Sequence, residues 1–589
     1  MFLKLSEEKV YVMIGLLTKM GGGLLMGKFA KVLVVLLCIC MLFVSCAPEG
    51  ANDRTTVDSE EYSQEVQNLE KLCLVWGYTK YHHPAFLFGQ KDWDEELLNL
   101  IPVVSEANED EENNILHEWF VSLGEIDYGT NRESSSLPED RLVVQADTNW
   151  TKDKDYLGEN LINDFSHLQR IPNVNRSKAP VQYGSFAPDF SNENSYEEMN
   201  YADLNYRLLG LFRLWNAMEY NYPYLDILDE DWHDLLSKYI SEMLKGSDRV
   251  SYELTIASLC TKLQDAHVAL YNSMFPITEF GLYGAPVELV QAEGQLVVYK
   301  VLEEDCQLQV GDVICKLEGN DIKDIIAHRR EYVSTPTEDK IINSLGGMLL
   351  RSNNEEFEVT VLREGKELTV TVKGKMSFYI TSVTADSPYQ ILESNIGVLN
   401  PGALESGGLA SAMNHLNSTD GLIIDLRQYP TDYIPFILAE YLVDGSEECI
   451  MFTAPSMSFP GTYIKNMKSS GRTKESITEA YSKPVVVLMD ERTQSMAEYT
   501  IMSIRNGENV TIMGENSVGS NGDIAYLPLP GGINMSFTSQ GIYTPDGGQT
   551  QRIGLTPDIE VHPTIKGIKE GKDELKEAAV AYIQEQNAK

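Results

Sequence analysis

Apolar side chains recur at helical spacing in two parts of the N-terminal half. Residues 208–215 read Leu-Leu-Gly-Leu-Phe-Arg-Leu-Trp, a spacing typical of a helix that packs against a core. Residues 76–84 are echoed by residues 215–223, and the Asp-Trp-Asp of 92–94 by the Asp-Trp-His of 231–233, each 139 residues later. Matches at a single ungapped offset predict a duplicated helical module.

The repeat places the first helical module at residues 65–130 and the second at residues 201–275. Residues 131–200, between the two copies, are rich in Asn, Ser, Asp and Pro. That composition predicts irregular connecting structure.

Residues 276–375 have a different pattern, with short runs rich in β-branched residues. We predict strands in this region at residues 296–301, 313–317, 357–362 and 368–372. The sequence Gly-Asp-Val-Ile at 311–314, followed by Leu-Glu-Gly-Asn-Asp-Ile at 317–322, resembles a motif of PDZ domains.

PDZ domains bind an extended peptide or a C-terminus as an added strand. The resemblance therefore implies a peptide partner and assigns peptide binding to Gly281 and Leu282. The alternative is a spacer that only orients the neighbouring domains.

From residue 376 to residue 589, short apolar runs alternate with helical stretches. The runs lie at residues 396–399, 422–426, 485–489 and 510–513. Nearly continuous apolar runs suit strands that are buried on both faces of a parallel sheet. Helices are expected around 407–418, 433–443 and 496–505, with a terminal amphipathic helix at 572–586. The whole pattern predicts a multidomain α+β protein.

The first 45 residues have the layout of an export signal. A short basic stretch at 26–31 precedes an apolar run at 32–44, which is shorter than the ~20 residues of a transmembrane helix. Residues 42–46, Leu-Phe-Val-Ser-Cys, resemble a bacterial lipobox in which Cys46 carries the lipid. We therefore expect a cell-envelope lipoprotein, attached to a membrane through a polar tether at 46–64. The alternative is ordinary secretion.

The composition narrows the range of partners. The formal net charge is −41, which repels phosphate backbones and excludes nucleic acid as a partner. The chain has eight Cys but no CxxC pair, and no HExxH sequence. Neither a metal nor an organic cofactor is indicated.

Ser495 follows the apolar run 485–489 and begins a predicted helix. The unsatisfied N–H of Met496 and the positive end of the helix dipole would stabilise an oxyanion beside a nucleophilic serine. The alternative is that Ser495 or Thr493 only caps the helix. A nucleophile also needs a base, and His267, which ends the second helical module, is a candidate. His267 could equally be a packed histidine.

A set of ordered motifs distinguishes these alternatives. The motifs that follow the PDZ-like region are Asp-Leu-Arg at 425–427, Thr-Gln-Ser-Met-Ala-Glu at 493–498, Gly-Glu-Asn-Ser-Val-Gly at 514–519 and Gly-Leu-Thr-Pro-Asp at 554–558. Together they resemble the tail-specific (C-terminal processing) serine peptidase family. The resemblance implies a crotonase/ClpP-like fold for the last domain and makes Ser495 the nucleophile.

The family has two catalytic styles. In one, a Lys follows the last Gly of the third motif, but here Gly519 is followed by Ser520. The tricorn-like style uses a His before the PDZ-like region, and Asp265-Ala266-His267 fits that position. The resemblance therefore assigns the base to His267.

Three departures from the tricorn-like pattern affect the predicted site. Ala266 stands where a Ser is usual, and Gln551 stands where a Glu is usual, so Gln551 could orient His267 only as an uncharged amide. Residues 431–432, Thr-Asp, replace the usual Gly-Gly of the loop expected to give a second oxyanion N–H, here that of Thr431. Candidates for the missing acid are Glu498, Glu515 and Asp523.

The sequence therefore predicts a serine endopeptidase that cleaves peptides or unfolded C-terminal segments through an acyl-enzyme. The first alternative is a weak or inactive peptidase fold that binds peptides or lipophilic ligands. A second alternative treats the duplicated modules as a ligand-binding or assembly platform with a degenerate peptidase core.

Overall fold

The computed structural model describes residues 62–129, 138–168, 170–172, 174–184, 187–376, 387–472 and 480–589. The predicted signal segment, Cys46 and nearly all of the tether lie outside these residues. Within the described ranges no helix combines the length and apolarity needed to cross a membrane.

The two copies of the helical module form equivalent contacts. In the first copy, α3 (Gln64–His82) packs on α5 (Trp93–Ser105), and the Trp76 indole N–H donates to the carbonyl of Trp93 at 2.8 Å. In the second copy, α8 (Leu204–Asn221) carries Trp215, whose N–H donates to the carbonyl of Trp232 at 3.1 Å. The repeated residues therefore make the same hydrogen bond in both copies.

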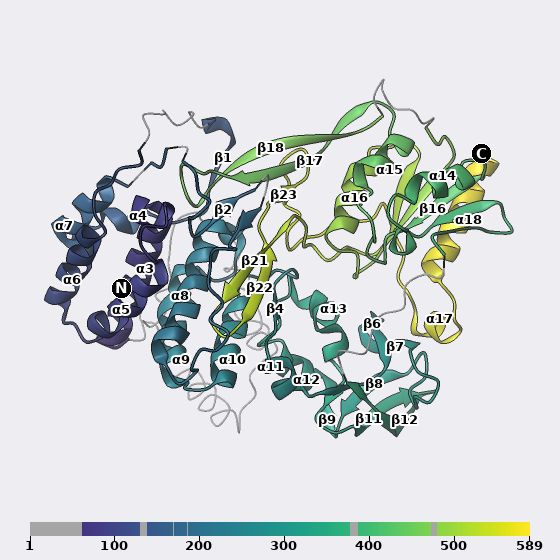
Figure 1. Cartoon of the computed structure of the whole chain (residues 1–589). Helices are drawn as coiled ribbons and strands as arrows, with labels where there is room; N and C mark the ends of the chain where they lie inside the picture. Colours follow the sequence, from purple (N-terminus) through teal and green to yellow (C-terminus); the bar gives the residue numbers. More distant parts are fainter. Residues whose placement is uncertain are drawn as a thin grey trace, which may run out of the picture. The chain divides into compact units, whose positions relative to one another are not determined.

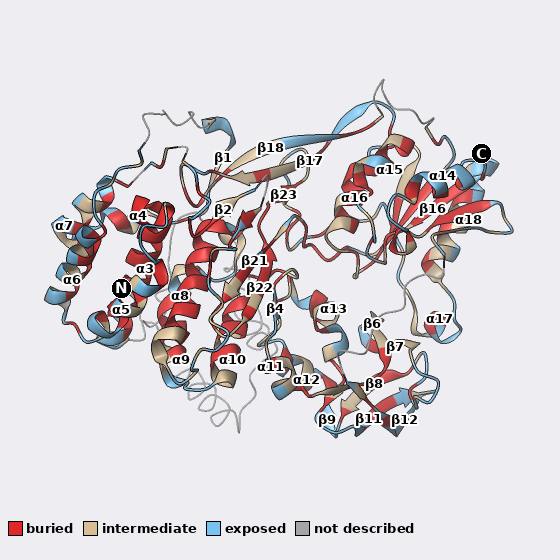
Figure 2. Ribbon diagram, in the orientation of Figure 1, coloured by how far each residue is buried: buried red, intermediate tan, exposed pale blue. Residues whose placement is uncertain are grey.

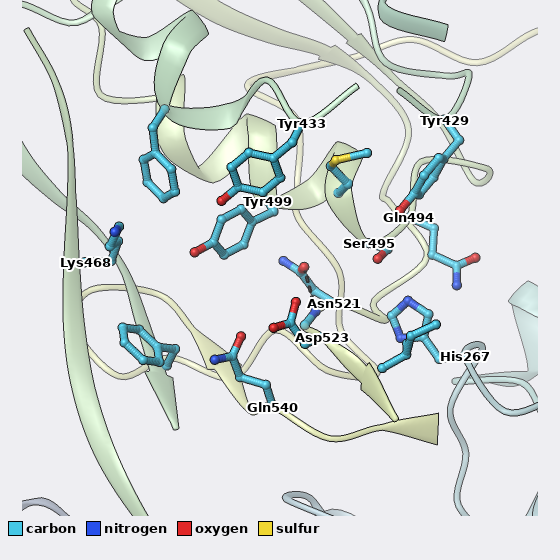
Figure 3. Close-up of a pocket in the computed structure, with 15 residues that line it drawn as sticks. His267, Tyr429, Tyr433, Lys468, Gln494, Ser495, Tyr499, Asn521, Asp523 and Gln540 are labelled. Carbon is cyan, nitrogen blue, oxygen red and sulfur yellow. Dashed lines mark hydrogen bonds between the residues drawn. The ribbon is translucent and has the colours of Figure 1, made fainter. Parts of the chain in front are cut away.

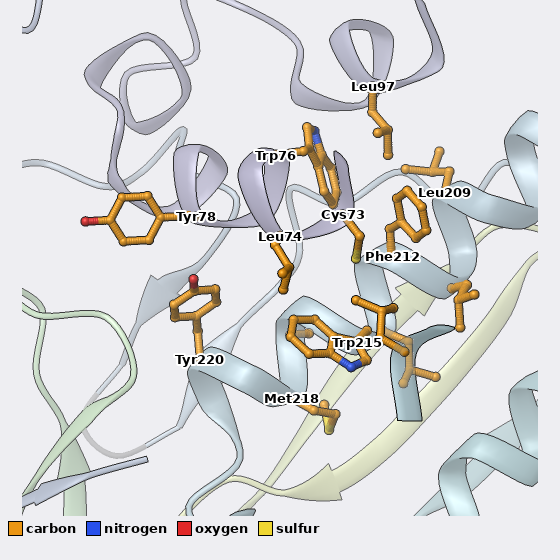
Figure 4. Packing of buried hydrophobic residues seen from close by; sticks show 14 of the residues in the cluster. Cys73, Leu74, Trp76, Tyr78, Leu97, Leu209, Phe212, Trp215, Met218 and Tyr220 are labelled. Carbon is orange, nitrogen blue, oxygen red and sulfur yellow. The ribbon is translucent and has the colours of Figure 1, made fainter. Parts of the chain in front are cut away.

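The two copies pack against each other through α3 and α8 (Figure 4). Gly77 and Asn216, which occupy equivalent positions in the repeat, meet at this contact. A Cβ atom on Gly77 would lie 1.7 Å from the Asn216 side-chain oxygen, and the Asn216 amide donates to the Cys73 carbonyl at 3.1 Å. Only glycine fits at position 77 in this arrangement.

Further helices complete the N-terminal region. They are α4 (Pro84–Leu87), α6 (Glu109–Ser122), α9 (Leu236–Lys245) and α10 (Arg249–Thr261). The connection predicted to be irregular also contains a helix, α7 (Lys154–Ser166), so that prediction is wrong for this segment. Gly158, at φ 74°, breaks the regular helical spacing inside α7 and obscures it in the sequence.

The PDZ-like region is built on an antiparallel sheet with strand order β12-β11-β8-β7-β6. Its strands are β6 (Val287–Ala292), β7 (Gln295–Val301), β8 (Val313–Leu317), β11 (Glu356–Arg363) and β12 (Lys366–Lys373). Two helices accompany the sheet, α12 (Ile322–Arg329) and α13 (Ile341–Leu345). Asp312 of the Gly-Asp motif accepts two hydrogen bonds from the Arg363 guanidinium, at 2.7 and 2.6 Å, and so ties the motif to β11.

The C-terminal region has a six-stranded sheet with order β14-β15-β16-β19-β20-β24. Its central strands β15 (Ile396–Leu399), β16 (Gly421–Asp425), β19 (Val485–Met489) and β20 (Val510–Gly514) are parallel, and β14 (Tyr389–Ile391) and β24 (Ile559–Glu560) form the edges. The almost complete burial of these strands explains their continuous apolar runs (Figure 2).

Helices cover both faces of this sheet (Figure 1). On one face lie α14 (Leu409–Leu416), α15 (Pro435–Leu442) and α16 (Met496–Ile504), and on the other lies α18 (Glu574–Ala588). The multidomain α+β architecture with an α/β peptidase-like domain is confirmed.

Two small sheets join the helical modules to the C-terminal region. In one, β4 (Ala269–Tyr271) pairs with β22 (Ile533–Thr538), which pairs with β21 (Ile524–Leu529). In the other, the hairpin of β17 (Ser446–Pro455) and β18 (Thr462–Gly471) pairs with β1 (Leu142–Val144) and β23 (Ile542–Tyr543). Because β4 begins two residues after His267, the first sheet fixes the position of that histidine.

The remaining short elements connect these parts. They are α11 (Phe275–Phe280), α17 (Ile565–Lys569), β2 (Gln182–Tyr183), β3 (Pro188–Asp189), β5 (Tyr283–Gly284), β9 (Asn320–Asp321), β10 (Arg351–Ser352) and β13 (Lys375–Met376).

Candidate active site

Ser495 occupies a sharp turn between β19 and α16. Its backbone has φ 55° and ψ −118°, whereas the cap residues Asp92 and Asn108 of other helices have negative φ. A positive φ is strained for serine, and such strain is typical of functional sites. The Ser495 N–H donates to the Ser520 carbonyl at 2.9 Å and to Glu498 at 3.0 Å, which holds the turn in place. The geometry favours a positioned nucleophile over a simple helix cap.

Met496 is the first residue of α16, so its N–H lies at the positive end of the helix dipole. It lines the same cavity as Ser495. This position agrees with the predicted role of the Met496 N–H as an oxyanion donor.

Thr431 is not placed as an oxyanion donor, and that prediction is wrong. Its N–H donates to the Pro401 carbonyl at 3.1 Å, so it is already used in a hydrogen bond to a neighbouring turn. The neighbouring Asp432 carboxylate accepts from the Gly407 N–H at 2.7 Å and from the Tyr433 N–H at 2.9 Å. Both carboxylate oxygens of Asp432 therefore accept backbone N–H groups, one from its own loop and one from the loop that contains Gly407.

His267 and Ser495 line the same cavity, whose volume is about 530 Å³, and they face each other in Figure 3. The imidazole Nδ1 lies 2.8 Å from the Thr538 hydroxyl and 3.2 Å from the Ser520 hydroxyl. The Ser520 hydroxyl donates to Asp265, so it is free to accept from Nδ1–H. This network assigns the proton to Nδ1 and leaves Nε2 as the acceptor that a general base requires.

Asp265 supplies a carboxylate to this network. Its Oδ1 accepts from the Ser520 hydroxyl at 2.6 Å and lies 3.8 Å from His267 Nδ1, and its Oδ2 accepts from the Thr538 N–H at 2.9 Å. The side chain is fully buried. The Asp265 carboxylate is therefore connected to the imidazole through the Ser520 hydroxyl, and Ser520 stands at the position that carries a Lys in the other catalytic style.

Gln551, which the sequence predicted to orient His267, does not contact the imidazole through a hydrogen bond. It is buried, but its side-chain amide makes no hydrogen bond to His267, whose Nδ1 partners are Ser520 and Thr538. Among the other acid candidates, Glu515 pairs with His562 at 2.7 Å. Asp523 lines the cavity without a hydrogen bond to the imidazole. The sequence motif contained the acid, Asp265, but without the fold Ser520 could not be linked to it.

Glu498 organises the loops of the site and does not contact His267, so its prediction as the acid is wrong. It accepts from the Ser517 hydroxyl at 2.5 Å and from the backbone N–H groups of Gly519 and Ser520 at 2.9 and 3.3 Å. Burial raises its pKa to about 7, against the opposing effect of these donors. Glu498 therefore ties the nucleophile turn to the loop that carries Ser520.

One lysine near the cavity was missed by the sequence reasoning. Lys468, on β18, lines the cavity, and its Nζ lies 4.8 Å from the centre of the Phe436 ring. Figure 3 shows it across the cavity from Ser495, where it makes no hydrogen bond to that serine. Of these two side chains, His267 faces Ser495 in Figure 3, whereas Lys468 lies on the far side of the cavity.

A second cavity of about 510 Å³ lies between the PDZ-like region and the C-terminal region. Val287 and Leu289 of β6 line one side, and Asn343 and Gly346 from α13 and the turn that follows it line the other. Gly281 is instead buried, because a Cβ there would lie 2.3 Å from the Ser352 backbone, and neither Gly281 nor Leu282 lines this groove. The groove begins at Ala285, and the assignment of peptide binding to Gly281 and Leu282 stays a prediction.

The described part of the chain contains no cluster of three or more His, Cys, Asp or Glu arranged to hold a metal. The cysteines in that part, Cys73, Cys260, Cys306, Cys315 and Cys449, are free thiols.

Two known protein families match separate parts of the chain, which correspond to the PDZ-like region and the C-terminal region. Residues 283–389 match the PDZ domain, and residues 395–561 match Peptidase family S41. The chain carries an S41 peptidase domain. Ser495 and Ser520 lie inside this S41 domain, whereas Asp265 and His267 precede the PDZ domain.

A carboxy-terminal-processing protease from Bartonella bacilliformis is 31% identical over 91 residues, which are 15% of this chain and 21% of that protein. The match thus spans about a fifth of the length of that curated relative.

Among solved structures, mature CPAF complexed with lactacystin is 13% identical, with TM-score 0.48, over 65% of this chain and 98% of that one. The photosystem II D1 C-terminal processing protease is 19% identical, with TM-score 0.38, over 63% of this chain and 98% of that one. A putative peptidase from Parabacteroides merdae is 15% identical, with TM-score 0.39, over 65% of this chain and 96% of that one.

Proposed function

We propose that this protein is a serine endopeptidase that works through an acyl-enzyme intermediate. The observation that carries the proposal is that Ser495 and His267 line one cavity, and that the imidazole of His267 is connected through the Ser520 hydroxyl to the buried carboxylate of Asp265. The S41 domain match supports the same reaction class.

The proposed chemistry has two steps. The Ser495 oxygen attacks the peptide carbonyl while His267 Nε2 takes its proton, and the Met496 N–H stabilises the oxyanion. The imidazolium then gives the proton to the leaving amine as the C–N bond breaks, leaving an ester on Ser495. Water, deprotonated by His267, hydrolyses that ester and restores the serine. Asp265 stabilises the imidazolium through Ser520 in both steps.

The proposed substrate is an unfolded segment or a C-terminal tail. The PDZ groove offers β6 for strand addition. Tyr429 lines both this groove and the cavity at Ser495, so the two are adjacent. A chain bound along β6 would pass Tyr429 to reach the nucleophile. We also propose, from the sequence alone, that Cys46 anchors the enzyme to the cell envelope.

The test is covalent labelling with a serine-directed fluorophosphonate. We expect the wild type to be labelled and Ser495→Ala to remain unlabelled, because the probe needs the activated hydroxyl. Ser503→Ala is a matched control, since Ser503 is a buried serine on the same helix that donates to the Pro435 carbonyl. Equal labelling of the wild type and Ser495→Ala would reject Ser495 as the nucleophile.

A second candidate function is binding of a lipophilic ligand without catalysis. The aromatic lining of the cavity, with the rings of Tyr433, Phe436 and Tyr499, would suit such a ligand. An unlabelled wild type that binds a fluorescent fatty acid would favour this alternative.

The pH dependence tests His267 as the base. Burial lowers its pKa below the ordinary 6.5, and the charge of Asp265 offsets part of that effect. A base must be neutral, so kcat/KM should rise with pH through the His267 pKa and reach more than half its plateau at pH 6.5. The measurement is kcat/KM of a peptide between pH 4.5 and 8.5. A half-maximal point above pH 6.5 would contradict this assignment.

A further inference from the structure

The cavity at Ser495 contains a carboxylate that the proposed reaction does not use. Asp523 lines this cavity together with a group of aromatic residues. The group consists of Tyr433, Phe436, Phe452 and Tyr499. Within the described ranges, no basic side chain forms an ion pair with Asp523. Burial raises the pKa of its carboxyl, and no cation offsets the rise.

The aromatic rings and the carboxylate share one space. Figure 3 shows Tyr433 and Tyr499 in the same cavity as Asp523, with their hydroxyls on the side that faces Lys468. The negative charge of Asp523 adds to the effect of burial in raising the pKa of both tyrosines. Figure 3 also draws Asp523 between Ser495 and the wall that carries Lys468.

We propose that this cavity receives the side chain of the residue whose carbonyl Ser495 attacks, and that it selects Lys or Arg at that position. The inference rests on the proposed peptidase function. The aromatic rings would pack against the methylene groups of a long side chain, and Asp523 would pair with its charged end.

An apolar side chain fits this cavity less well. It would remove water from the Asp523 carboxylate and leave that charge unpaired, which is costly in a partly enclosed site. A basic side chain displaces the same water but supplies the missing partner. The electrostatic field of a chain with net charge −41 also attracts cationic peptides.

An acidic side chain would have to bind Lys468, the other charged residue of the cavity. The Lys468 ammonium already lies over the Phe436 ring and is exposed, so water satisfies its charge. An acidic side chain that extends from Ser495 toward Lys468 would also pass Asp523 and be repelled. Asp523 therefore decides the sign of the preferred charge.

The experiment uses the full chain and a set of peptide phosphonates that differ only in the side chain at the reacting position: Lys, norleucine or Glu. We measure the rate of covalent inactivation for the wild type, for Asp523→Asn, and for Asp444→Asn as a control. Asp444 is an exposed acid outside the cavity, so its variant removes the same charge from the surface. A general fluorophosphonate serves as the reference probe for all three proteins.

For the wild type we expect the Lys probe to react about tenfold or more faster than the norleucine probe, and the Glu probe to be slowest. In Asp523→Asn the ratio of the Lys rate to the norleucine rate should fall by about tenfold, whereas Asp444→Asn should keep the wild-type ratio.

If the fluorophosphonate labels Ser495 but norleucine or Glu is preferred, or if Asp523→Asn keeps the wild-type ratio, the inference is wrong and the peptidase proposal stands. If the fluorophosphonate itself fails to label the wild type, the proposed function fails, and the inference falls with it.

Discussion

Replacing Asp265 by Asn is expected to lower kcat/KM by about 10²- to 10⁴-fold while the protein remains folded. The amide nitrogen cannot accept the Ser520 hydroxyl proton. If that nitrogen donates to Ser520 instead, the Ser520 hydroxyl reverses and donates to His267 Nδ1. The proton of the neutral imidazole then moves to Nε2, where a base needs a lone pair.

Kinetics and the pH profile distinguish this role from a purely structural one. Loss of the Asp265 charge removes the effect that raises the His267 pKa, so the acid limb of kcat/KM should move to lower pH as the plateau falls. A variant that is only misfolded would lose plateau activity without this displacement. An unchanged acid limb in Asp265→Asn would show that the Asp265 charge does not act on His267.

Ser520 offers a graded comparison for the same network. Ser520→Ala should lower kcat/KM by about tenfold, less than Asp265→Asn, because Thr538 still accepts from Nδ1 at 2.8 Å. Ser520→Thr retains the hydroxyl and should recover most of that loss. If Ser520→Thr and Ser520→Ala are equally impaired, the hydroxyl is not the connecting group.

Replacing Glu193 by Gln is expected to destabilise the helical region by about 3–5 kcal/mol. Glu193 lies 2.6 Å from Lys80 and 3.0 Å from Arg213, and all three side chains are fully buried. Arg213 also pairs with Asp94 at 2.6 Å. Without the Glu193 charge, two buried cations share the single carboxylate of Asp94, and water cannot reach them.

Tryptophan fluorescence during urea unfolding measures this effect selectively. All six tryptophans of the chain, Trp76, Trp93, Trp119, Trp150, Trp215 and Trp232, lie in the helical modules or the segment between them. The double variant Lys80→Met/Glu193→Gln is the control, because it removes one charge of each sign and leaves the Arg213–Asp94 pair balanced. It should regain part of the lost stability. A double variant as unstable as the sum of its single changes would show that the charges are not coupled.

The sequence predicted those parts of the fold whose signals are local. Continuous apolar runs identified β15, β16, β19 and β20 because strands buried on both faces leave no room for polar positions. The duplicated Trp residues identified the helical modules because each indole makes its hydrogen bond within its own copy. Helix α7 was missed because Gly158 interrupts its pattern.

The site was predictable only in part, because its connections are long-range. The hydroxyl that links acid and base comes from Ser520, 255 residues from Asp265, and nothing in either local motif indicates the other. Thr431 was assigned from its place in a loop, but the acceptor of its N–H, the Pro401 carbonyl, comes from a turn 30 residues earlier. Lys468 enters the cavity because the β17–β18 hairpin carries it there.

The contact between Gly77 and Asn216 has a consequence for the origin of the helical region. In a dimer of identical modules, a residue that meets its own counterpart on the symmetry axis must be the same on both sides. Two asparagines would collide at this closeness, and two glycines would leave a void. Joining both modules in one chain removes that restriction, so one side can be small and the other large. The Asn216 side chain thus fills the space that Gly77 leaves between α3 and α8.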